Sequence, residues 1–442
     1  MFPHRSTNYN LFGEKLTELT SFQEISCAAV ESGFIIRSRK IFPVEFLLTL
    51  IFGFYSKEEP SISKFLRIYN SLVDKEKKVV YSSFYERFNN EALAFVDKCL
   101  ENYISRQKGG VNAELKGYLR TFKDVLIKDN TIVRVHSYLA NKYPATRTRR
   151  ITAGIKVSVL LSVVCNGPHS VTFFPEKTND AKTLIIDPWV KDILLLIDRG
   201  FFKFEVFAQI VDYGGSFVTR LKSSTTSDIV SVGLGIPEKM RKKIIGLDIQ
   251  KAIEVIKPHK LDIDAIVTVR YYPSGKKKGE FPFKLRFIAI FNEDTDEYHT
   301  YFTNIPEHEL AGRDVAALYA ARWDIENLFR EAKSENLLGR LKSKNEAITE
   351  IFIRIPIIRL IISRELFGVA RRMLEASVVM RLKKRSWAIV FAENARQILY
   401  NLGRQKRGLR VSAPWRDIWE TLVEGAISPH VNRKTHTSKL YI

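Results

Sequence analysis

The spacing of apolar and polar positions divides the chain into five regions. Residues 1–115 place apolar and charged side chains at helical spacing, with no strong strand signal. Residues 116–205 carry short apolar and β-branched runs typical of strands, and strand spacing recurs in residues 206–305. Residues 306–370 and 371–442 return to helical spacing, and the last region is basic. We therefore expect a mixed α and β protein with helical regions at both ends.

The second region predicts a sheet. The five consecutive aliphatic residues Ile193–Ile197 suit a strand that is buried on both faces. The predicted order is three strands, one helix capped by Asp180, and a fourth strand. The strands are Val125–Val135, Ile155–Cys165, Ser170–Phe174 and Ile193–Ile197, and the helix is Ala181–Val190.

The third region reads as a β-rich insertion. It contains a predicted helix, Pro237–Ile256, and three predicted strands, Ala265–Tyr272, Phe283–Phe291 and Tyr298–Thr303. The separation between the acids of the neighbouring regions, residues 198 and 326, is too long for a simple connection. An inserted subdomain is therefore expected between them.

The N-terminal region contains two predicted helices, Ser61–Asn70 and Tyr81–Phe95, on either side of the charged segment Asp74–Lys78. This arrangement resembles a helix-turn-helix unit that reads DNA. A plain helical bundle with a solvated charged face explains the pattern equally well. The cations that would contact phosphates are Lys64, Arg67, Lys75, Lys77, Lys78 and Arg87.

The stretch Leu318–Asn336 predicts a helix with two distinct faces. At about 100° per residue, one strip about 60° wide carries four polar side chains. The adjoining face is apolar and should pack on a core. An Arg and a Glu four residues apart are usually no more than a surface ion pair. The strip consists of Tyr319, Arg322, Glu326 and Lys333.

Two further acids stand in strand-like contexts. Asp129 follows the apolar run Val125–Ile127, and Asp198 ends the run Ile193–Ile197. Either side chain could instead cap a helix or form a turn, which is the commoner use of Asp. Together with Glu326, however, they form a set of carboxylates that could hold hard divalent cations. The sequence does not show that the three acids converge.

Composition fits a nucleic-acid partner. The chain has 442 residues, and 70 Lys and Arg against 49 Asp and Glu give a formal net charge of +21. Such an excess favours a polyanion, usually nucleic acid.

The three cysteines, Cys27, Cys99 and Cys165, are widely spaced, which indicates neither a disulfide framework nor a zinc site. The polar start and the short apolar stretch Phe42–Tyr55 indicate neither a signal peptide nor a membrane span, so a cytoplasmic, nucleoid-associated protein is expected.

The spacing Tyr319-x2-Arg322-x3-Glu326-x6-Lys333 reproduces the Y-R-E-K signature of DDE transposases of the insertion-sequence-four type. The sequences KDNT at Asp129, DRG at Asp198 and YFTNIP at Tyr301–Pro306 resemble other motifs of that family. The resemblance covers residues 124–338 well and is vague before residue 110 and after about 370. Asn130 departs from the small or hydroxyl residue that several relatives carry at that position.

The resemblance implies a ribonuclease H-like catalytic core, residues 116–205 and 306–370, interrupted by the β-rich insertion at 206–305. Residues 1–115 would bind DNA, and the basic helices at 371–442 would bind DNA or mediate dimerisation. The catalytic and metal-binding residues would be Asp129, Asp198 and Glu326, with Mg²⁺ as cofactor and Mn²⁺ as a substitute. The DNA contacts would come from Tyr319, Arg322, Lys333 and Arg199, and from Lys276, Lys277 and Lys278 in the basic loop Pro273–Gly279.

The implied activity is cut-and-paste transposition of an insertion sequence. The enzyme would act on double-stranded DNA as a homodimer in the synaptic complex, without a membrane partner. It would cut the inverted repeats at the transposon ends, pass through a hairpin on each end, and join the 3′-OH to target DNA. Two alternatives remain open: a catalytically silent DNA-binding relative, and a ribonuclease H-like nuclease that acts on RNA or branched DNA.

Overall fold

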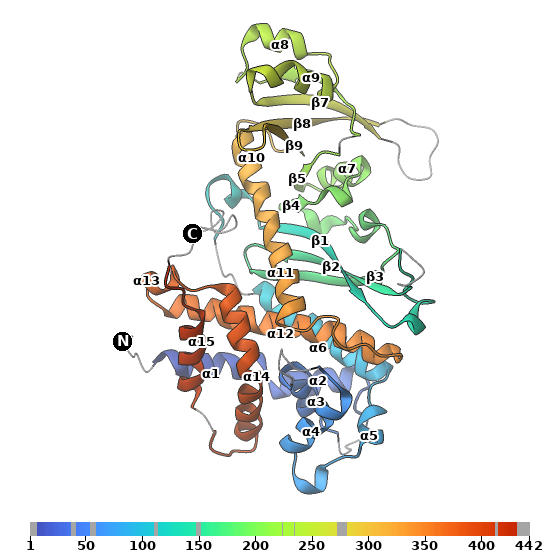
Figure 1. The fold of residues 1–442 in the computed structure, drawn as a ribbon, viewed down its shortest axis with the longest axis vertical. Helices are drawn as coiled ribbons and strands as arrows, with labels where there is room; N and C mark the ends of the chain where they lie inside the picture. Colours follow the sequence, from blue (N-terminus) through green and yellow to red (C-terminus); the bar gives the residue numbers. More distant parts are fainter. Residues whose placement is uncertain are drawn as a thin grey trace.

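The computed structural model describes residues 7–36, 41–53, 59–109, 114–146, 152–222, 224–233, 235–271, 281–411 and 414–430. The molecule is elongated (Figure 1). A helical part occupies one end, a sheet with its helices fills the middle, and the inserted subdomain lies at the other end.

In the described residues, nine strands form one sheet in the order β3-β2-β1-β4-β5-β9-β8-β7-β6. The first half has β1 antiparallel to β2, β2 antiparallel to β3, and β1, β4 and β5 mutually parallel. Three antiparallel strands followed by two parallel ones on the far side of β1 are the ribonuclease H-like arrangement, so the predicted fold class is confirmed. The core strands are β1 (Asp124–Arg134), β2 (Gly154–Ser162), β3 (Gly167–Pro175), β4 (Ile193–Ile197) and β5 (Ser216–Arg220).

The predicted helix Ala181–Val190 is wrong. Two short 3₁₀ turns take its place, η4 (Asp180–Thr183) and η5 (Pro188–Val190). Pro188 forces the preceding Asp187 into an extended conformation (φ −137°, ψ 177°), which a helix cannot include. The cap of η4 is Asn179, whose side chain accepts a hydrogen bond from the Ala181 N–H, so Asp180 is left for another role.

The insertion extends the sheet through β9 (Glu297–Thr303), β8 (Phe281–Asn292), β7 (Ile263–Tyr271) and β6 (Asp228–Val232). The strands β5 and β6 were not predicted. The predicted helix Pro237–Ile256 is two helices, α8 (Glu238–Ile244) and α9 (Ile249–Ile256). Gly246 breaks it with φ 83°, and Asp248 caps α9. The basic loop Pro273–Gly279 lies outside the described residues.

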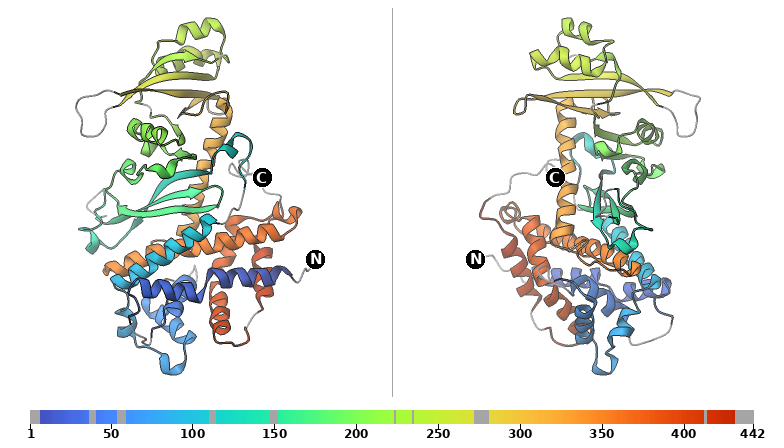
Figure 2. Two further views of the ribbon diagram at one scale, coloured as in Figure 1. Left: turned by 180° about the vertical axis from the view of Figure 1, so that it is seen from behind. Right: turned by 45° about the vertical axis from the view of Figure 1, so that its right-hand side comes forward.

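The N- and C-terminal helices form one helical part (Figure 2). The side chain of Phe12 packs against Trp415 and Trp419, with ring centroids 6.4 and 5.6 Å apart, and Phe52 packs against Phe391. The N-terminal helices are α1 (Thr7–Leu19), α2 (Phe22–Glu31), α3 (Pro43–Phe52), α4 (Ile62–Leu72), α5 (Tyr81–Tyr85) and α6 (Asn90–Gly109). The C-terminal helices are α12 (Glu346–Met373), α13 (Ala376–Val379), α14 (Lys384–Lys406) and α15 (Trp415–Ala426).

The helix predicted over Tyr81–Phe95 is interrupted. The helix α5 ends at Tyr85, and α6 begins at Asn90 after Asn89, whose side chain accepts a hydrogen bond from the Ala92 N–H. Asn in this position starts a helix by satisfying one of its free N–H groups, so a new helix begins there.

Two helices that follow each other end to end connect the insertion, the middle of the sheet and the helical part. The helices α10 (Gly312–Tyr319) and α11 (Trp323–Ser334), linked by the 3₁₀ turn η8 (Ala320–Arg322), run from the insertion to α12 (Figure 1). The predicted apolar face is buried: Leu318, Ala321, Ile325, Leu328, Phe329 and Ala332 are all at most 7% exposed. The buried carboxylate of Glu331 on α11 accepts hydrogen bonds from Arg364 on α12 at 2.9 and 3.2 Å.

Among the described residues, no helix is long and apolar enough to cross a membrane.

Replacing Arg364 with Met is expected to destabilise the protein by about 3–5 kcal/mol. The change leaves the buried charge of Glu331 unpaired and removes the donor to the Asn166 carbonyl. Urea unfolding measures the difference. The matched control is Arg371→Met, an exposed position on the same helix, where about 0.5 kcal/mol or less is expected. Equal effects of the two changes would contradict this account of how α11 is anchored.

Candidate active site

The sheet brings two of the acids together by strand register. In the parallel pair β1 and β4, Lys128 lies opposite Ile197. The residues that follow this pair are Asp129 on β1 and Asp198 after β4, so the two acids lie side by side where β4 ends. The strand β4 is fully buried, as a run of five aliphatic residues predicts. The carboxylate of Asp198 also accepts a hydrogen bond from the Gly200 N–H, so it caps the turn η6 (Arg199–Phe201) as well.

The third acid reaches the same place from α11. The guanidinium of Arg322 lies 2.7 Å from Glu326 Oε1, 3.5 Å from Asp198 Oδ1 and 3.7 Å from Asp129 Oδ2. The exposed fractions of these side chains are 14% for Arg322 and 21%, 35% and 32% for Asp129, Asp198 and Glu326. The three acids therefore surround one cation in a half-buried site.

Tyr319 is placed differently from the expected phosphate-gripping strip. Its side chain is 5% exposed, and its hydroxyl donates a 3.3 Å hydrogen bond to the carbonyl of Ile197. Its ring packs edge-on against Tyr301 of β9 at 5.4 Å. Burial raises the pKa of Tyr319 well above its usual value, and the negative charge of Asp198 raises it further. The residue thus ties the end of α10, just before the turn that leads into α11, to the end of β4.

Burial makes Asp129 reluctant to ionise. It raises the pKa of Asp129 to about 6, and the charges of Asp198 and Glu326 add to the rise. The hydrogen bond from the Asn130 N–H and the charge of Arg322 oppose it. Since the carboxylates repel one another, the site favours a bound cation.

A polar network that sequence reasoning missed lies beside these acids. The carboxylate of Asp180 accepts hydrogen bonds from Asn130 Nδ2 at 2.8 Å and Lys156 Nζ at 2.5 Å. A Cβ placed on Gly200 would lie 3.3 Å from Asp180 Oδ2 and 3.6 Å from Asp198 Oδ2, so the two carboxylates flank this glycine. Asn130 thus has a structural partner, which explains how an amide fits at that position.

A buried lysine, Lys128, lies near this network. Lys128 donates a hydrogen bond to Ser158 Oγ, and its Nζ lies 5.6 Å from the centroid of the Phe201 ring. Burial lowers the pKa of Lys128 to about 7, against the charges of Asp129 and Asp180, which raise it. The charge of this lysine is therefore disfavoured by burial and favoured by the two nearby acids.

The remaining predicted site residues lie at the surface. Lys333 and Arg199 are exposed. The pKa of Lys333 is lowered, first by partial burial and then by the positive charge of Arg134. Trp323 is 54% exposed, and its ring centroid lies 5.9 Å from the Arg322 guanidinium carbon. Lys276, Lys277 and Lys278 lie outside the described residues.

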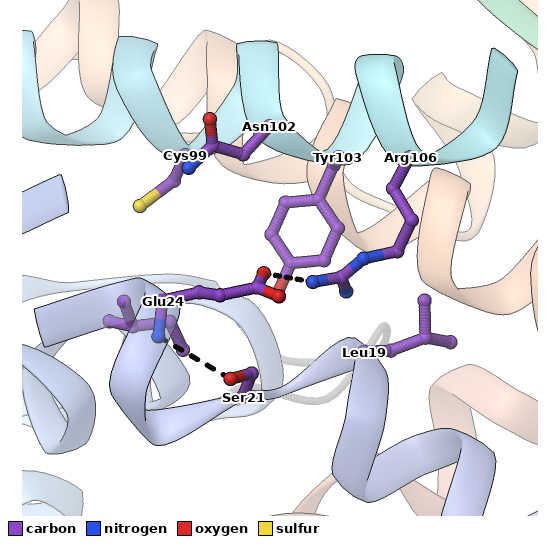
Figure 3. Close-up of a pocket in the computed structure, with 8 residues that line it drawn as sticks. Leu19, Ser21, Glu24, Cys99, Asn102, Tyr103 and Arg106 are labelled. Atoms are coloured by element: carbon purple, nitrogen blue, oxygen red, sulfur yellow. Dashed lines mark hydrogen bonds and ion pairs between the residues drawn. The ribbon is translucent and has the colours of Figure 1, made fainter. Parts of the chain in front are cut away.

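Two cavities lie away from the acids. One is between α2 and α6 in the helical part, where Arg106 pairs with Glu24 (Figure 3). The other, of about 540 Å³, lies between the turn after Asp198 and the insertion. It is lined by Phe202, Lys203, Phe204, Lys222, Ser224, Thr225, Thr226, Ser227, Asp228, Asp248 and Thr268. Neither of these two cavities is lined by Asp129, Asp198 or Glu326.

The donor set fits a hard divalent cation, since carboxylate oxygens are the ligands that such ions prefer. As the side chains stand, no group of three His, Cys, Asp or Glu in the described part of the chain is arranged to hold a metal ion. Around Asp129, Asp198 and Glu326, the guanidinium of Arg322 contacts all three acids. The chemistry of the ligands therefore suits a metal, and Arg322 lies among them.

Comparison with known proteins identifies the family of the chain. The family model described as "Transposase DDE domain" matches residues 120–358, more than half of the chain. The chain is 23% identical over 366 residues to the transposase for insertion sequence element IS1151 of Clostridium perfringens, covering 74% of each protein. It is 24% identical over 359 residues to the transposase for insertion sequence element IS231B of Bacillus thuringiensis subsp. berliner, covering 73% of each.

Among solved structures, a piggyBac transposase synaptic complex with hairpin DNA, determined by cryo-EM, matches with a TM-score of 0.44 and 10% identity. The match covers 98% of this chain and 90% of that one. The family model and the insertion-sequence relatives confirm the family predicted from the Y-R-E-K signature. The chain belongs to the DDE transposases, of the insertion-sequence-four type.

Proposed function

We propose that this insertion-sequence transposase cuts the DNA ends of its element and joins them to target DNA at the site formed by Asp129, Asp198 and Glu326. The observation that carries the proposal is that three acids from β1, β4 and α11 meet around one cation, Arg322. The family membership supports it. The substrate is double-stranded DNA with terminal inverted repeats, and the protein acts as a dimer in the synaptic complex.

The three carboxylates would hold two divalent ions, Mg²⁺ or in its place Mn²⁺. When bound, such ions activate the attacking oxygen and stabilise the leaving one. In the first step, the oxygen of a water molecule attacks phosphorus, and the 3′-oxygen of the transposon end leaves. That 3′-OH then attacks a phosphodiester of the opposite strand and displaces the 3′-oxygen of the flanking DNA, which closes a hairpin on the transposon end. Water hydrolyses the hairpin and restores the 3′-OH, which attacks a phosphodiester of the target and displaces a target 3′-oxygen.

The cations around the acids would hold the DNA. Arg322, Lys333 and Arg199 carry the charge and the N–H donors that bind phosphate. Lys276, Lys277 and Lys278 of the basic loop would add further contacts to the DNA backbone. We propose that Tyr319 supports DNA binding mainly by joining the end of α10 to β4, and that its hydroxyl contacts a phosphate only as a secondary role. Action on chromosomal DNA implies a nucleoid-associated protein.

Two alternatives compete with this proposal. A catalytically silent DNA-binding relative would bind the ends with a salt dependence set by its basic surface, without cutting. A ribonuclease H-like nuclease would cut RNA or branched DNA without needing terminal repeats. The intact set of three acids favours catalysis over the silent relative, and the match to insertion-sequence transposases favours transposition over the other nuclease.

The direct test is cleavage of DNA that carries the native flanks of the gene, with Mg²⁺ present. Wild type is expected to cut at the ends, and Glu326→Gln is expected to bind the same DNA and lose at least about 100-fold in cleavage rate, because a neutral amide binds divalent ions poorly. Glu335→Gln, on the residue following α11, is the matched control and should cut normally. Cutting by Glu326→Gln at the wild-type rate would exclude this acid from the site.

A second prediction concerns the pH dependence of stability in metal-free protein. The pKa of Asp129 is about 6 in the folded state, against an ordinary value of 3.8. Ionisation therefore opposes folding, and this penalty is absent below about pH 4 and complete above about pH 6. Asp129→Asn should gain stability over wild type by up to about 3 kcal/mol as pH rises through this window. Urea unfolding in EDTA at several pH values measures it, and a pH-independent difference would refute the assignment.

A third prediction concerns Asp180 as a positioning residue. Asp180→Ala leaves Asn130 Nδ2 and the buried ammonium of Lys156 without this acceptor. We expect the rate constant for cleavage to fall about 10–100-fold while the KM for end DNA is unchanged. Asp180→Asn keeps an acceptor oxygen and should recover part of the rate. The control Asp187→Ala alters an exposed residue that makes no side-chain cap and should have no effect. A change in KM alone would contradict a positioning role.

A further inference from the structure

The guanidinium of Arg322 occupies the centre of the three acids. Its three nitrogens each face a different carboxylate: Nη2 faces Glu326, Nε faces Asp198 and Nη1 faces Asp129. Among the described residues, no other cation makes an ion pair with these acids. We propose that, in the DNA-free protein, Arg322 takes the place of the divalent cation and that a DNA phosphate draws it away, so that metal loading depends on DNA. This inference rests on the proposed function.

The arrangement has an electrostatic reason. Three carboxylates in a half-buried site repel one another, and one guanidinium neutralises part of their charge. A divalent ion bound to the same oxygens would lie within a few ångströms of the guanidinium. At that distance two cations repel each other strongly in a partly buried site, because little water lies between them to screen their charges. Arg322 and the metal therefore compete for Asp129, Asp198 and Glu326.

The local structure offers Arg322 a second position. Its guanidinium carbon lies 5.9 Å from the ring centroids of Tyr319 and Trp323. Tyr319 is fixed by its hydrogen bond to Ile197 and is buried, whereas Trp323 is 54% exposed. An Arg side chain that leaves the acids can therefore stay against the Trp323 ring, where it meets solvent and can bind a phosphate.

Nearby cations do not substitute for Arg322. Among the described residues, Lys128 makes no ion pair with Asp129. Its ammonium instead donates to Ser158 and lies over the Phe201 ring. Arg330 lies on α11, which follows Arg322, but is exposed and donates to Asn327. Removing the charge of Arg322 should therefore affect the acids in a way that removing the charge of Arg330 does not.

The experiment measures Mn²⁺ binding by calorimetry, with Mn²⁺ paramagnetic resonance as a second readout. It uses the full chain with and without duplex DNA that carries the native gene flanks. Without DNA, Arg322→Gln should bind Mn²⁺ about tenfold or more tightly than wild type, because it lacks the competing charge. With DNA, wild type should gain affinity and Arg322→Gln should gain much less.

Two further variants keep the result interpretable. Arg330→Gln removes the same charge from an exposed position and should bind Mn²⁺ as wild type does. Arg322→Lys keeps the charge but cannot face three carboxylates at once, so its DNA-free affinity should fall between those of wild type and Arg322→Gln. This variant tests the inference even if Arg322→Gln does not fold.

The outcomes separate this inference from the proposed function. Equal Mn²⁺ affinity of wild type and both Arg322 variants, with and without DNA, would overturn the competition while leaving the metal site intact. Glu326→Gln is also introduced into wild type and into each Arg322 variant. If it weakens Mn²⁺ binding in none of them, the metal lies elsewhere and the proposed function is overturned as well. Weaker binding by Arg322→Gln than by wild type would show that Arg322 supports the metal instead of competing with it.

Discussion

The parallel pairing of β1 and β4 is the constraint on which the site depends. It sets Lys128 opposite Ile197 and so places Asp129 beside Asp198. A slip of one residue would turn either side chain to the other face of the sheet and separate the two acids. The end of β4 is also held by the helix that precedes α11, because the hydroxyl of Tyr319 donates to the carbonyl of Ile197. One backbone position therefore fixes both strands and the helix that carries the third acid.

Other contacts hold these elements in place, some beside the three acids and some farther from them. Near the acids, Asp180 joins β1 to the turn after Asp198 through Asn130 and the contact across Gly200. Farther away, the buried pair Glu331 and Arg364 ties α11 to α12, which is packed among the N- and C-terminal helices. Such buried pairs cost desolvation, so they stabilise a defined arrangement more than they add net stability. This arrangement keeps the spacing of the three carboxylates, which the proposed DNA-cutting site would need.

Much of the core could be predicted from the sequence. The aliphatic run Ile193–Ile197 is β4, and the apolar stripe on the helix after Leu318 is buried as its spacing predicted. These signals are local, because burial on one face or on both leaves a regular pattern. The helix predicted over Ala181–Val190 failed because apolar spacing carried more weight than Pro188. The role of Asp180 was invisible because its partners, Asn130 and Lys156, are brought to it by the sheet and not by any local spacing. The burial of Tyr319 was missed for the same reason, since its partners, Ile197 and Tyr301, lie on the strands β4 and β9.

The central claim is that Asp129, Asp198 and Glu326 form one metal-binding site. The most direct measurement is anomalous X-ray scattering from crystals of the protein grown with Mn²⁺ and its end DNA. The account predicts anomalous peaks bounded by these three carboxylates, with the guanidinium of Arg322 displaced toward a phosphate. Ordered carboxylates with Arg322 still among them, and Mn²⁺ peaks only elsewhere, would contradict it.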